Sequence, residues 1–579
     1  MIRKKITFLE VNSSYSHTML SYGYLRSCTE KMISGWKWSH IETTTNELED
    51  ASVLKLLAEK PGAVCATIYL FNHEFTLRIL KKFKALQPSC MIFLGGPEFL
   101  GDNEQFLRRN PEISAVVRGD ESSFHKLLSC FRNPSQWRTV PGACFIYKDR
   151  YNDGGFAKFA GNLDEIPSPY ENGYFTLGRP FYQIETSRGC TGRCSFCTSA
   201  LSNGTSHFGM ERIKSDLETM HKLGIREIRL VDRTFNEDKA RSFELLSLLR
   251  QYSGTRFHLE INPALVDEEL LGELRLFKDK CLHIEAGIQS LCAKSLKAVK
   301  RLGSPGKMIT GLRKLCELEN ADMHTDLIAG LPNQKYSDVL KDVTELVTLN
   351  PHEIQLENLK ILPGTPISSN PPKGLVWNPL PPYEVLKTAH MGLEDLVKTR
   401  NLSRMLDSFL NIPRLKNIFL FGFKRDKNFI EKFLSYVEQN SDPGQKQHLD
   451  RRLLLLKDYG DKNDKLFSEL SVFSWAACGF SADKFNMETE KIKPGSDAPP
   501  VDTVIYASNE TIVPSRIIHA SFSFNAGDAW IAPGARIEMK KHSYRFFTAH
   551  GNRVLRITWS MPVSLKPAQG VSIENAIPL

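Results

Sequence analysis

Short apolar runs alternate with amphipathic stretches along the first 135 residues. The apolar runs predict strands, and the stretches between them have the spacing of helices with one buried face. The predicted strands are Ile6–Val11, Ala63–Tyr69, Met91–Leu94 and Ala115–Val117, and the predicted helices are Leu20–Met32, Ala51–Ala58, Glu74–Ala85, Glu104–Arg108 and Glu121–Phe131. Strands that alternate with helices form a parallel sheet, whose ligands bind at the carboxyl ends of the strands. We therefore predict an α/β domain over residues 1–135.

The same rhythm returns between residues 176 and 375. Before it, residues 136–175 carry Pro141, Pro167 and Pro169, which predict a linker, with a small hairpin at Ala143–Tyr151. The six strands predicted beyond it are Tyr182–Thr186, Glu227–Val231, Arg256–Ile261, Cys281–Ala286, Asp322–Ile328 and Glu353–Leu359. Six strand–helix units predict a partial (β/α)6 barrel of the TIM type, with its chemistry at the carboxyl ends of the strands.

The rest of the chain changes character twice. Residues 376–485 predict a helical region, with helices at Val385–Lys398, Arg404–Phe409, Lys427–Gln439 and Gln447–Asp458. Residues 486–579 predict a linker followed by a small β-rich tail. Its β-rich runs are Thr503–Ala507, Arg516–Phe524, Arg536–Met539, Ser543–Thr548 and Val554–Trp559.

Length and composition set limits on the class of protein. A chain of 579 residues is too long for one core, and no apolar run reaches the roughly 18 residues of a membrane span. Met1–Lys5 leads directly into a predicted strand, so no signal peptide is expected, and 12 cysteines in this length do not indicate a disulfide framework. A cytoplasmic protein is therefore expected. The net charge of +9 is scattered without a basic, aromatic stripe, so a nucleic-acid partner is not expected.

Three cysteines follow the first predicted barrel strand at C-x3-C-x2-C spacing. Cys190, Cys194 and Cys197 lie on one loop, and thiolates favour iron–sulfur or zinc sites. A closed structural zinc site needs four ligands, and no fourth Cys or His follows at a suitable spacing. An iron–sulfur cluster with one open iron is the favoured interpretation, with zinc or plain buried thiols as alternatives.

This arrangement, with the aromatic Phe196 just before the last cysteine, resembles the radical S-adenosylmethionine (radical SAM) superfamily. The resemblance implies a 4Fe–4S cluster on the three cysteines, with SAM chelating the open iron. It also implies that Asp232 meets the methionyl amino group, that Glu285, Gln289 and Ser290 lie near the ribose, and that Ile328 and Leu362 lie beside the adenine. An ammonium pairs with a carboxylate, and adenine favours an apolar face, which agrees with these residue types.

A second resemblance concerns the N-terminal domain. One strand there ends in Gly95-Gly96-Pro97-Glu98 and the next in Arg118-Gly119-Asp120-Glu121, and glycine lets the backbone come close to a bound group. Such a domain directly upstream of a radical SAM barrel resembles the cobalamin-binding radical SAM family. The resemblance implies a flavodoxin-like or Rossmann-like fold over residues 1–135. It implies cobalamin contacts from Ser14, Tyr69, Asn72, Gly95, Gly96, Pro97, Glu98, Gly119 and Asp120.

One departure from cobalamin domains bears on the cobalt ligand. The Asp-x-His-x-x-Gly motif, which supplies a histidine to cobalt in domains of the methionine-synthase type, is absent, and His17 and His73 lack that context. We therefore predict cobalamin binding without a protein histidine on cobalt. A domain that has lost its ligand is the alternative.

The family resemblance implies an enzyme that cleaves SAM reductively and methylates an unactivated carbon or phosphorus of a small molecule or peptide. Rearrangement or cyclisation of the substrate, transfer of the 3-amino-3-carboxypropyl group of SAM, and a cobalamin or redox sensor are the alternatives. Methylthiotransferases carry a second cysteine triad in their N-terminal domain, whereas Cys28, Cys65 and Cys90 are scattered here. An electron donor such as flavodoxin or ferredoxin is the expected partner. No residue can be identified as a catalytic base from the sequence.

Overall fold

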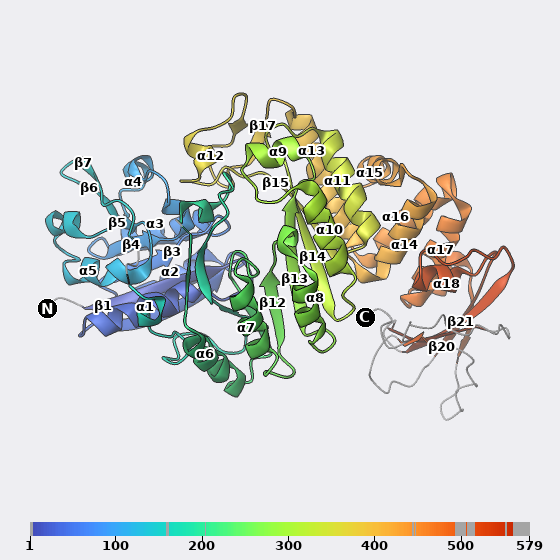
Figure 1. The fold of residues 1–579 in the computed structure, drawn as a ribbon, viewed down its shortest axis with the longest axis horizontal. Helices are drawn as coiled ribbons and strands as arrows, with labels where there is room; N and C mark the ends of the chain where they lie inside the picture. Colours follow the sequence, from blue (N-terminus) through green and yellow to red (C-terminus); the bar gives the residue numbers. More distant parts are fainter. Residues whose placement is uncertain are drawn as a thin grey trace. The chain divides into compact units, whose positions relative to one another are not determined.

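The structure, a computed structural model, describes residues 4–157, 161–202, 204–442, 445, 447–491, 505–506, 516–549 and 553–559. The chain forms two compact units. One unit comprises residues 1–342 and 357–396, and the other comprises residues 343–356 and 397–579 (Figure 1).

The first sheet of the first unit has seven strands in the order β2-β1-β3-β4-β5-β6-β7, and the first five are parallel. This order among the parallel strands is the flavodoxin-like one, with its switch point between β1 and β3. The elements are β1 (Lys5–Asn12), α1 (Leu20–Met32), β2 (Lys37–Thr44), α2 (Glu49–Glu59), β3 (Ala63–Thr67), α3 (His73–Leu86), β4 (Met91–Gly95), α4 (Glu104–Arg109), β5 (Ala115–Val117), α5 (Phe124–Ser129), β6 (Ala143–Tyr147) and β7 (Arg150–Asp153). The predicted flavodoxin-like fold is confirmed.

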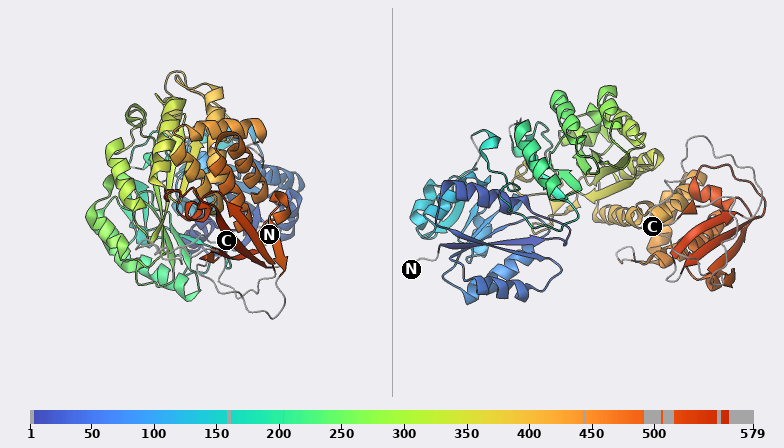
Figure 2. Two further views of the ribbon diagram at one scale, coloured as in Figure 1. Left: turned by 90° about the vertical axis from the view of Figure 1, so that its right-hand side faces the viewer. Right: turned by 90° about the horizontal axis from the view of Figure 1, so that it is seen from below.

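Helices cover both faces of this sheet (Figure 2). On one face α2 and α3 bury side chains such as Leu56, Leu80 and Phe83 against the strands. On the other face Phe124 and Trp137 pack over β4 and β5. Because both faces are buried, the strands are continuous apolar runs, which is why the sequence predicts them well.

The first sheet is larger than the sequence analysis predicts. Strand β2 was not predicted, and it pairs along its whole length with β1 as the edge strand. The hairpin predicted within the linker forms β6 and β7, and β6 pairs antiparallel with β5 through Val116 and Cys144. The sheet therefore continues through residue 153.

The second sheet is the open, six-stranded barrel, in the order β15-β14-β13-β12-β11-β8. Its strands are β8 (Tyr182–Ile184), β11 (Glu227–Leu230), β12 (Arg256–Glu260), β13 (Leu282–Gln289), β14 (Ala321–Ala329) and β15 (Glu353–Asn358). Its helices are α6 (Met210–Lys222), α7 (Lys239–Leu249), α8 (Glu268–Arg275), α9 (Ala293–Ala298), α10 (Pro305–Cys316) and α11 (Tyr336–Leu349). Side chains alternate between buried and half-buried along β13 and β14, as expected for strands with one face against helices and one toward the barrel interior.

Local sequence fixes where several barrel helices begin. Asp238 and Asp267 accept hydrogen bonds from backbone N–H groups of the first turns of α7 and α8, at 3.1 and 2.9 Å. Such caps satisfy donors that a helix leaves free, and they hold each helix start close to the preceding strand end. The strand ends are therefore well-ordered platforms for side chains.

Two small sheets border the barrel mouth. A ribbon of β9 (Ser187–Cys190) and β10 (Gly204–His207) carries the cysteine loop at its tip. Beyond the short α12 (Pro366–Ser369), β16 (Val376–Trp377) pairs with β17 (Val385–Lys387). The predicted helix Val385–Lys398 is therefore wrong in its first part, because Val385 pairs with Trp377 and the helix α13 (Leu393–Met405) begins only after Gly392.

The second unit contains a helical layer and a small sheet. Its further helices are α14 (Pro413–Arg425), α15 (Phe429–Asn440), α16 (Leu449–Asn463) and α17 (Lys465–Ala477), of which α14 and α17 were not predicted. Aromatic rings of Phe419, Phe429 and Phe433 pack on one another within this layer. The predicted helical region is confirmed.

The described part of the tail is β-rich, as predicted. It forms a sheet in the order β18-β20-β21-β22-β19 from β18 (Glu488–Lys491), β19 (Ile505–Tyr506), β20 (Arg516–Phe522), β21 (His542–Ala549) and β22 (Arg553–Trp559), with α18 (Ala526–Ile531). The predicted strand Arg536–Met539 is wrong, because these residues form no strand. Most of the predicted run Thr503–Ala507 lies outside the described residues. Among the described helices, none has the length and apolar character that crossing a membrane requires.

Candidate active site

The three cysteines of the C-x3-C-x2-C motif lie on the loop between β9 and β10. Cys194 is buried, and Cys190 and Cys197 are half-buried. Two backbone N–H groups point at sulfur atoms: Gly192 N lies 3.2 Å from Cys190 Sγ, and Ser199 N lies 3.4 Å from Cys197 Sγ. Such donors stabilise thiolates and orient them as metal ligands. The loop therefore already orients two of the three sulfur atoms.

Neighbouring segments hold this loop on both sides. Ser195 N donates to Val299 O at 2.9 Å, and Ser195 O accepts from Ile367 N at 2.9 Å. Arg301 Nη1 lies 3.9 Å from Cys194 Sγ, while its Nη2 donates to Gly287 O on β13. Burial raises the pKa of the Cys194 thiol, and the nearby guanidinium opposes this rise. Sequence analysis missed Arg301, because it lies 107 positions from Cys194 and no local signal links the two.

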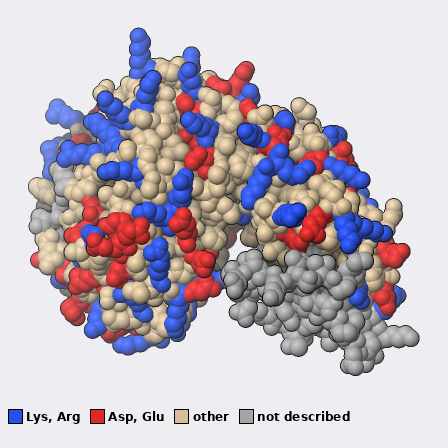
Figure 3. Space-filling model, turned by 45° about the vertical axis from the view of Figure 1, so that its right-hand side comes forward, with Lys and Arg blue, Asp and Glu red and all other residues tan. Residues whose placement is uncertain are grey.

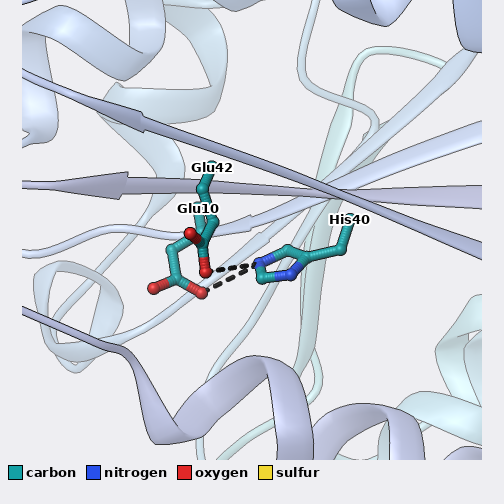
Figure 4. A group of neighbouring side chains, drawn as sticks. All are labelled: Glu10, His40 and Glu42. Atoms are coloured by element: carbon teal, nitrogen blue, oxygen red, sulfur yellow. Dashed lines mark hydrogen bonds and ion pairs between the residues drawn. The ribbon is translucent and has the colours of Figure 1, made fainter. Parts of the chain in front are cut away.

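The spacing of the three thiols argues against a single metal ion. Among the described residues, the only three metal-binding side chains whose ligand atoms all lie within 4.8 Å of one another are Glu10, His40 and Glu42 (Figure 4). A tetrahedral zinc ion would bring its sulfur ligands to about 3.8 Å from one another, given Zn–S bonds of about 2.3 Å. Ligands on separate irons of a cluster need not approach so closely. The three thiols do not all meet that spacing in this structure, and a cluster would not require it.

The group in Figure 4 is itself a hydrogen-bonded clamp. Glu10 accepts from Asn12 Nδ2 at 2.8 Å, from Met19 N at 3.0 Å and from His40 Nε2 at 3.0 Å. Glu42 pairs with Arg179, which comes from the segment before the barrel. The carboxylates are thus already occupied, and the clamp ties the first sheet to the start of the barrel.

Asp232, predicted at the methionyl amino group, follows β11 and is buried. Its Oδ1 accepts from Thr186 N at 2.9 Å and from Ser187 N at 2.7 Å, and its Oδ2 accepts from Thr186 Oγ1. Burial raises the pKa of this carboxyl. In this structure both oxygens hold the start of the cysteine ribbon, and the SAM contact of Asp232 stays a prediction.

The residues predicted near the ribose divide into two groups. Glu285 and Gln289 are half-buried on the same side of β13, and His258 Nε2 lies 3.4 Å from Glu285 Oε2. Burial alone would raise the pKa of Glu285, but the hydrogen bond from His258 brings it down to about 2. Ser290 is fully buried, and its hydroxyl donates to Asp342 Oδ2 at 2.7 Å, which fixes the start of the α9 segment. Ser290 therefore has a structural role here.

The apolar residues predicted beside the adenine line the same mouth of the barrel. Ile328 and Leu362 are half-buried at the ends of β14 and β15, and Phe196 is half-buried in the cysteine loop. Each keeps a partly accessible apolar surface. No described contact decides whether these three meet the adenine, and that prediction stays open to test.

A hollow of about 480 Å³ lies between the carboxyl ends of the first sheet and the barrel mouth. Six of the predicted cobalamin residues line it: Tyr69, Gly95, Gly96, Pro97, Gly119 and Asp120. From the barrel it is lined by Gln183, Glu185, Arg188, Val231, Arg233 and Glu260. Burial raises the pKa of Glu260 to about 7, so this carboxyl changes its protonation state near neutral pH. The hollow therefore brings both predicted cofactor domains to one space.

A second hollow of about 520 Å³ continues this space to the cysteine loop. It shares six lining residues with the first, among them Asp120, Arg188 and Arg233. It reaches Ser199, which bonds to Cys197, and Gly204, which pairs with Cys190. Arg188 pairs with Glu185 at 2.8 Å and with Glu121 at 2.9 Å, so it joins the two domains across the shared wall. The two hollows thus adjoin one another, and together they extend from the strand ends of the first sheet to the edge of the cysteine loop.

Three predicted cobalamin residues lie outside the first hollow. Asn72 accepts from Tyr69 N at 2.8 Å and donates to Val11 O at 2.9 Å, which locks the loop after β3. Ser14 bonds to His17 Nδ1 at 2.8 Å. Each supports the local backbone and does not face the hollow.

Glu98 accepts from His73 Nδ1 at 2.7 Å and from Tyr383 Oη at 2.8 Å, and all three side chains are buried. We name this group the Glu98 anchor. It ties the loop after β4 to the segment that follows the barrel. Close by, a Cβ on Gly101 would lie 2.9 Å from Gly364 N, so the two backbones touch.

The glycines of the predicted cofactor loops differ in how much space a side chain would have at each position. A Cβ on Gly96, which has a φ of +108°, would lie 2.5 Å from Ile68 O, and one on Gly119 would lie 2.0 Å from Ala157 O. These two are needed by the protein's own backbone. A Cβ on Gly95 would meet only Val117 O, at 3.5 Å. Gly95 is therefore the position where a side chain can be added without breaking the loop.

Two family models match separate parts of the chain. The radical SAM superfamily matches residues 184–346, which include the three cysteines, and a family described as a protein of unknown function (DUF4080) matches residues 373–476. The first match runs from the end of β8 into α11. The second begins at the segment that carries Tyr383 and extends through most of α17.

Known proteins resemble longer parts of the chain. TokK of Streptomyces tokunonensis, a cobalamin-dependent radical SAM methyltransferase, is 23% identical over 392 residues, which are 63% of this chain and 56% of TokK. The cobalamin-dependent SAM radical enzyme OxsB, solved with aqua-cobalamin, superposes with a TM-score of 0.57 at 14% identity, covering 82% of this chain and 80% of OxsB. TsrM from Kitasatospora setae, a radical SAM methyltransferase solved with cobalamin and an iron–sulfur cluster, gives 0.53 at 15% identity, covering 66% of this chain and 78% of TsrM.

The chain spans about half the length of the curated relatives that it matches, 45% and 56% for the first two. The solved structures show that the fold is shared over a sheet domain and a barrel together. The chain therefore contains a radical SAM domain, and it is similar to cobalamin-dependent radical SAM enzymes over its sheet domain and barrel.

Proposed function

We propose that this chain is a radical SAM enzyme that cleaves SAM reductively and uses cobalamin to methylate an unactivated carbon or phosphorus. The carrying observation is the pair of adjoining hollows, which share six lining residues and extend from the strand ends of the first sheet to the edge of the cysteine loop. TokK and TsrM, which resemble this chain, are named as methyltransferases, and TsrM has been solved with tryptophan as its substrate. A small molecule or peptide is the substrate that we propose.

The residues of the chain suit the three cofactors. Cys190, Cys194 and Cys197 would hold a 4Fe–4S cluster, since two of the sulfurs already receive backbone hydrogen bonds. When bound, the cluster supplies the electron that splits SAM, and cobalamin supplies the methyl group. The half-buried apolar and polar groups at the ends of β13, β14 and β15 would bind and orient SAM. The walls of the hollow would exclude water from the reacting groups.

The domains would divide this work. Residues 1–135 would bind cobalamin and residues 176–375 would bind the cluster and SAM, with residues 136–175 as the connection. The helical region 376–485 would contribute Tyr383 to the Glu98 anchor. We assign no chemistry to residues 486–579. A flavodoxin or ferredoxin would supply the electron.

The cobalt would receive no histidine from the protein. His17 Nδ1 is bonded to Ser14 at 2.8 Å, and His73 Nδ1 is bonded to Glu98 at 2.7 Å. Neither histidine is among the residues that line the hollow. The electron paramagnetic resonance spectrum of the cob(II)alamin state should therefore lack nitrogen splitting from a protein imidazole. Such splitting would refute this part of the proposal.

The test of cobalamin binding uses Gly95. A leucine at Gly95 should fold and lose most of the bound cobalamin, because its side chain enters open space at the strand end. The matched control is Gly272→Leu on α8, where a Cβ meets nothing within 4 Å. Cobalamin retention after reconstitution and gel filtration is the measurement. Full retention by Gly95→Leu, or no retention by the wild type, would refute cobalamin binding in this hollow.

The test of the reaction is anaerobic reconstitution followed by product analysis. Wild-type protein with dithionite should form 5′-deoxyadenosine from SAM. With a methyl acceptor, each product should consume two SAM molecules and give one S-adenosylhomocysteine and one 5′-deoxyadenosine. Methylthioadenosine in place of deoxyadenosine would indicate aminocarboxypropyl transfer, and no SAM cleavage would indicate a sensor.

A further inference from the structure

The surface beside the cysteine loop is basic and contains no acid over a long stretch of sequence. Residues 291–316 carry seven Lys or Arg and neither Asp nor Glu. Arg193 in the cysteine loop and the α9–α10 segment together present five exposed cations, which we name the basic face: Arg193, Lys294, Lys297, Lys300 and Lys307. Figure 3 shows basic and acidic side chains together over the side of the molecule that it presents. The basic face is therefore a local concentration of one charge.

The cations of the basic face have no partner within the described part of the chain. None of the five side chains makes a hydrogen bond or ion pair there, whereas Lys314, farther along α10, pairs with Glu268 at 2.7 Å. Leu302, between Lys300 and Lys307, is 52% exposed. Unpaired cations around an exposed apolar side chain are typical of a protein-docking surface, rather than of a surface whose charges are paired within the chain.

Residues that lie between the cations of the basic face contact the proposed cluster site. Val299, between Lys297 and Lys300, accepts the 2.9 Å hydrogen bond from Ser195, which follows Cys194 in the loop. Arg301 reaches the Cys194 sulfur at 3.9 Å. A partner seated on this face would therefore lie next to the segment that contacts the cysteine loop.

We infer that the basic face docks an acidic one-electron carrier protein that reduces the cluster. This inference rests on the proposed function, which requires one electron for each SAM cleaved. The carrier would give up one electron, and a cluster held by Cys190, Cys194 and Cys197 would accept it. Complementary charge steers such an encounter and sets its orientation, so that the carrier's redox centre comes next to Cys194.

The test reverses three charges of the basic face. The face variant is Lys294→Glu/Lys297→Glu/Lys300→Glu. With a purified acidic flavodoxin as the reduced donor at low salt, the rate of cluster reduction should fall by about tenfold or more, because electrostatic steering contributes on the order of 10–10³ to such rates. Added salt should slow cluster reduction in the wild type and so reduce the difference in rate between the wild type and the face variant. Reduction by dithionite should be unchanged.

The matched control changes the net charge equally at another place. Lys222, Arg275 and Lys278 are exposed at the carboxyl ends of α6 and α8 and in the loop that follows α8. The control variant Lys222→Glu/Arg275→Glu/Lys278→Glu should retain the wild-type rate with flavodoxin. Equal loss in both triple variants would overturn the docking site and leave only an effect of net charge.

Binding is measured separately from chemistry. Titration of the cluster-loaded protein with oxidised flavodoxin should show about tenfold weaker binding for the face variant and wild-type binding for the control. Unchanged flavodoxin binding in the face variant overturns the inference whatever the activity. Tighter binding of a single-stranded RNA than of flavodoxin, lost in the face variant, also overturns it by identifying a nucleic-acid surface. Absence of SAM cleavage with dithionite would instead refute the proposed function. The flavodoxin titration would still show whether the basic face is the docking site.

Discussion

Replacing Arg301 by glutamine should lower the reduction potential of the cluster. The guanidinium lies 3.9 Å from the Cys194 sulfur and is held there by its second bond, to Gly287 O. A fixed cation stabilises the reduced cluster more than the oxidised one, because reduction adds negative charge. Its removal should therefore make the cluster harder to reduce.

The size of the effect follows from the contact. With an effective dielectric constant of about 20, a unit charge 3.9 Å from the sulfur interacts by about 4 kcal/mol. The added electron spreads over the whole cluster and solvent screens a half-buried side chain, so about 1–3 kcal/mol is the expected difference between the two oxidation states. For a one-electron couple this is about 40–130 mV, since 59 mV corresponds to a factor of ten.

The assay is a redox titration of the reconstituted protein, followed by the electron paramagnetic resonance signal of the reduced cluster. Arg301→Lys keeps the charge and should recover most of the potential. Arg193→Gln is the matched control, because Arg193 is exposed on the same loop and contacts no sulfur in the described structure. The reasoning is refuted when Arg301→Gln and Arg193→Gln shift the potential equally.

Three further outcomes are expected. Cys194→Ala should lose the iron and all SAM cleavage, whereas Cys281→Ala, at another half-buried thiol, should keep its iron, as iron analysis of the reconstituted proteins would show. Burial raises the pKa of Glu260 to about 7. The contribution of protonated Glu260 to folding stability is therefore complete below about pH 4.5 and is lost as the pH rises through 7. Between pH 5 and 8 the melting temperature of Glu260→Gln should fall less than that of the wild type. Tyr383→Phe removes a buried donor to Glu98 and should cost about 1–3 kcal/mol locally, seen as faster hydrogen exchange in the loop after β4; unchanged exchange would contradict the role of the anchor.

Sequence patterns predicted the elements whose signal is local. The helix Leu20–Met32 begins and ends where it was predicted, because its apolar spacing lies within one segment. The edge strand β2 was missed, since most of its side chains are only half-buried and its sequence alternates weakly. Helix α17 was missed because its side chains are buried on nearly all sides, which removes the helical period.

The candidate site likewise contains some features that have a local sequence signal and others that have none. The cysteine loop is one continuous motif, and its residues can be recognised without the fold. The bond between Glu98 and Tyr383 joins residues 285 positions apart, and no local pattern records it. Asp232 was correctly placed at a strand end, but the sequence does not show that two backbone N–H groups already occupy its carboxylate.

The Glu98 anchor also sets an order of events during synthesis. Glu98 leaves the ribosome 285 residues before Tyr383, and at about 5–20 residues per second this separation lasts about 15–60 s. The first sheet can fold in that interval, since domains generally fold as units while the chain is being made. Its strand ends then remain uncovered until the barrel and the segment beyond it have been translated. A large cofactor has its widest access to those strand ends before the chain is finished.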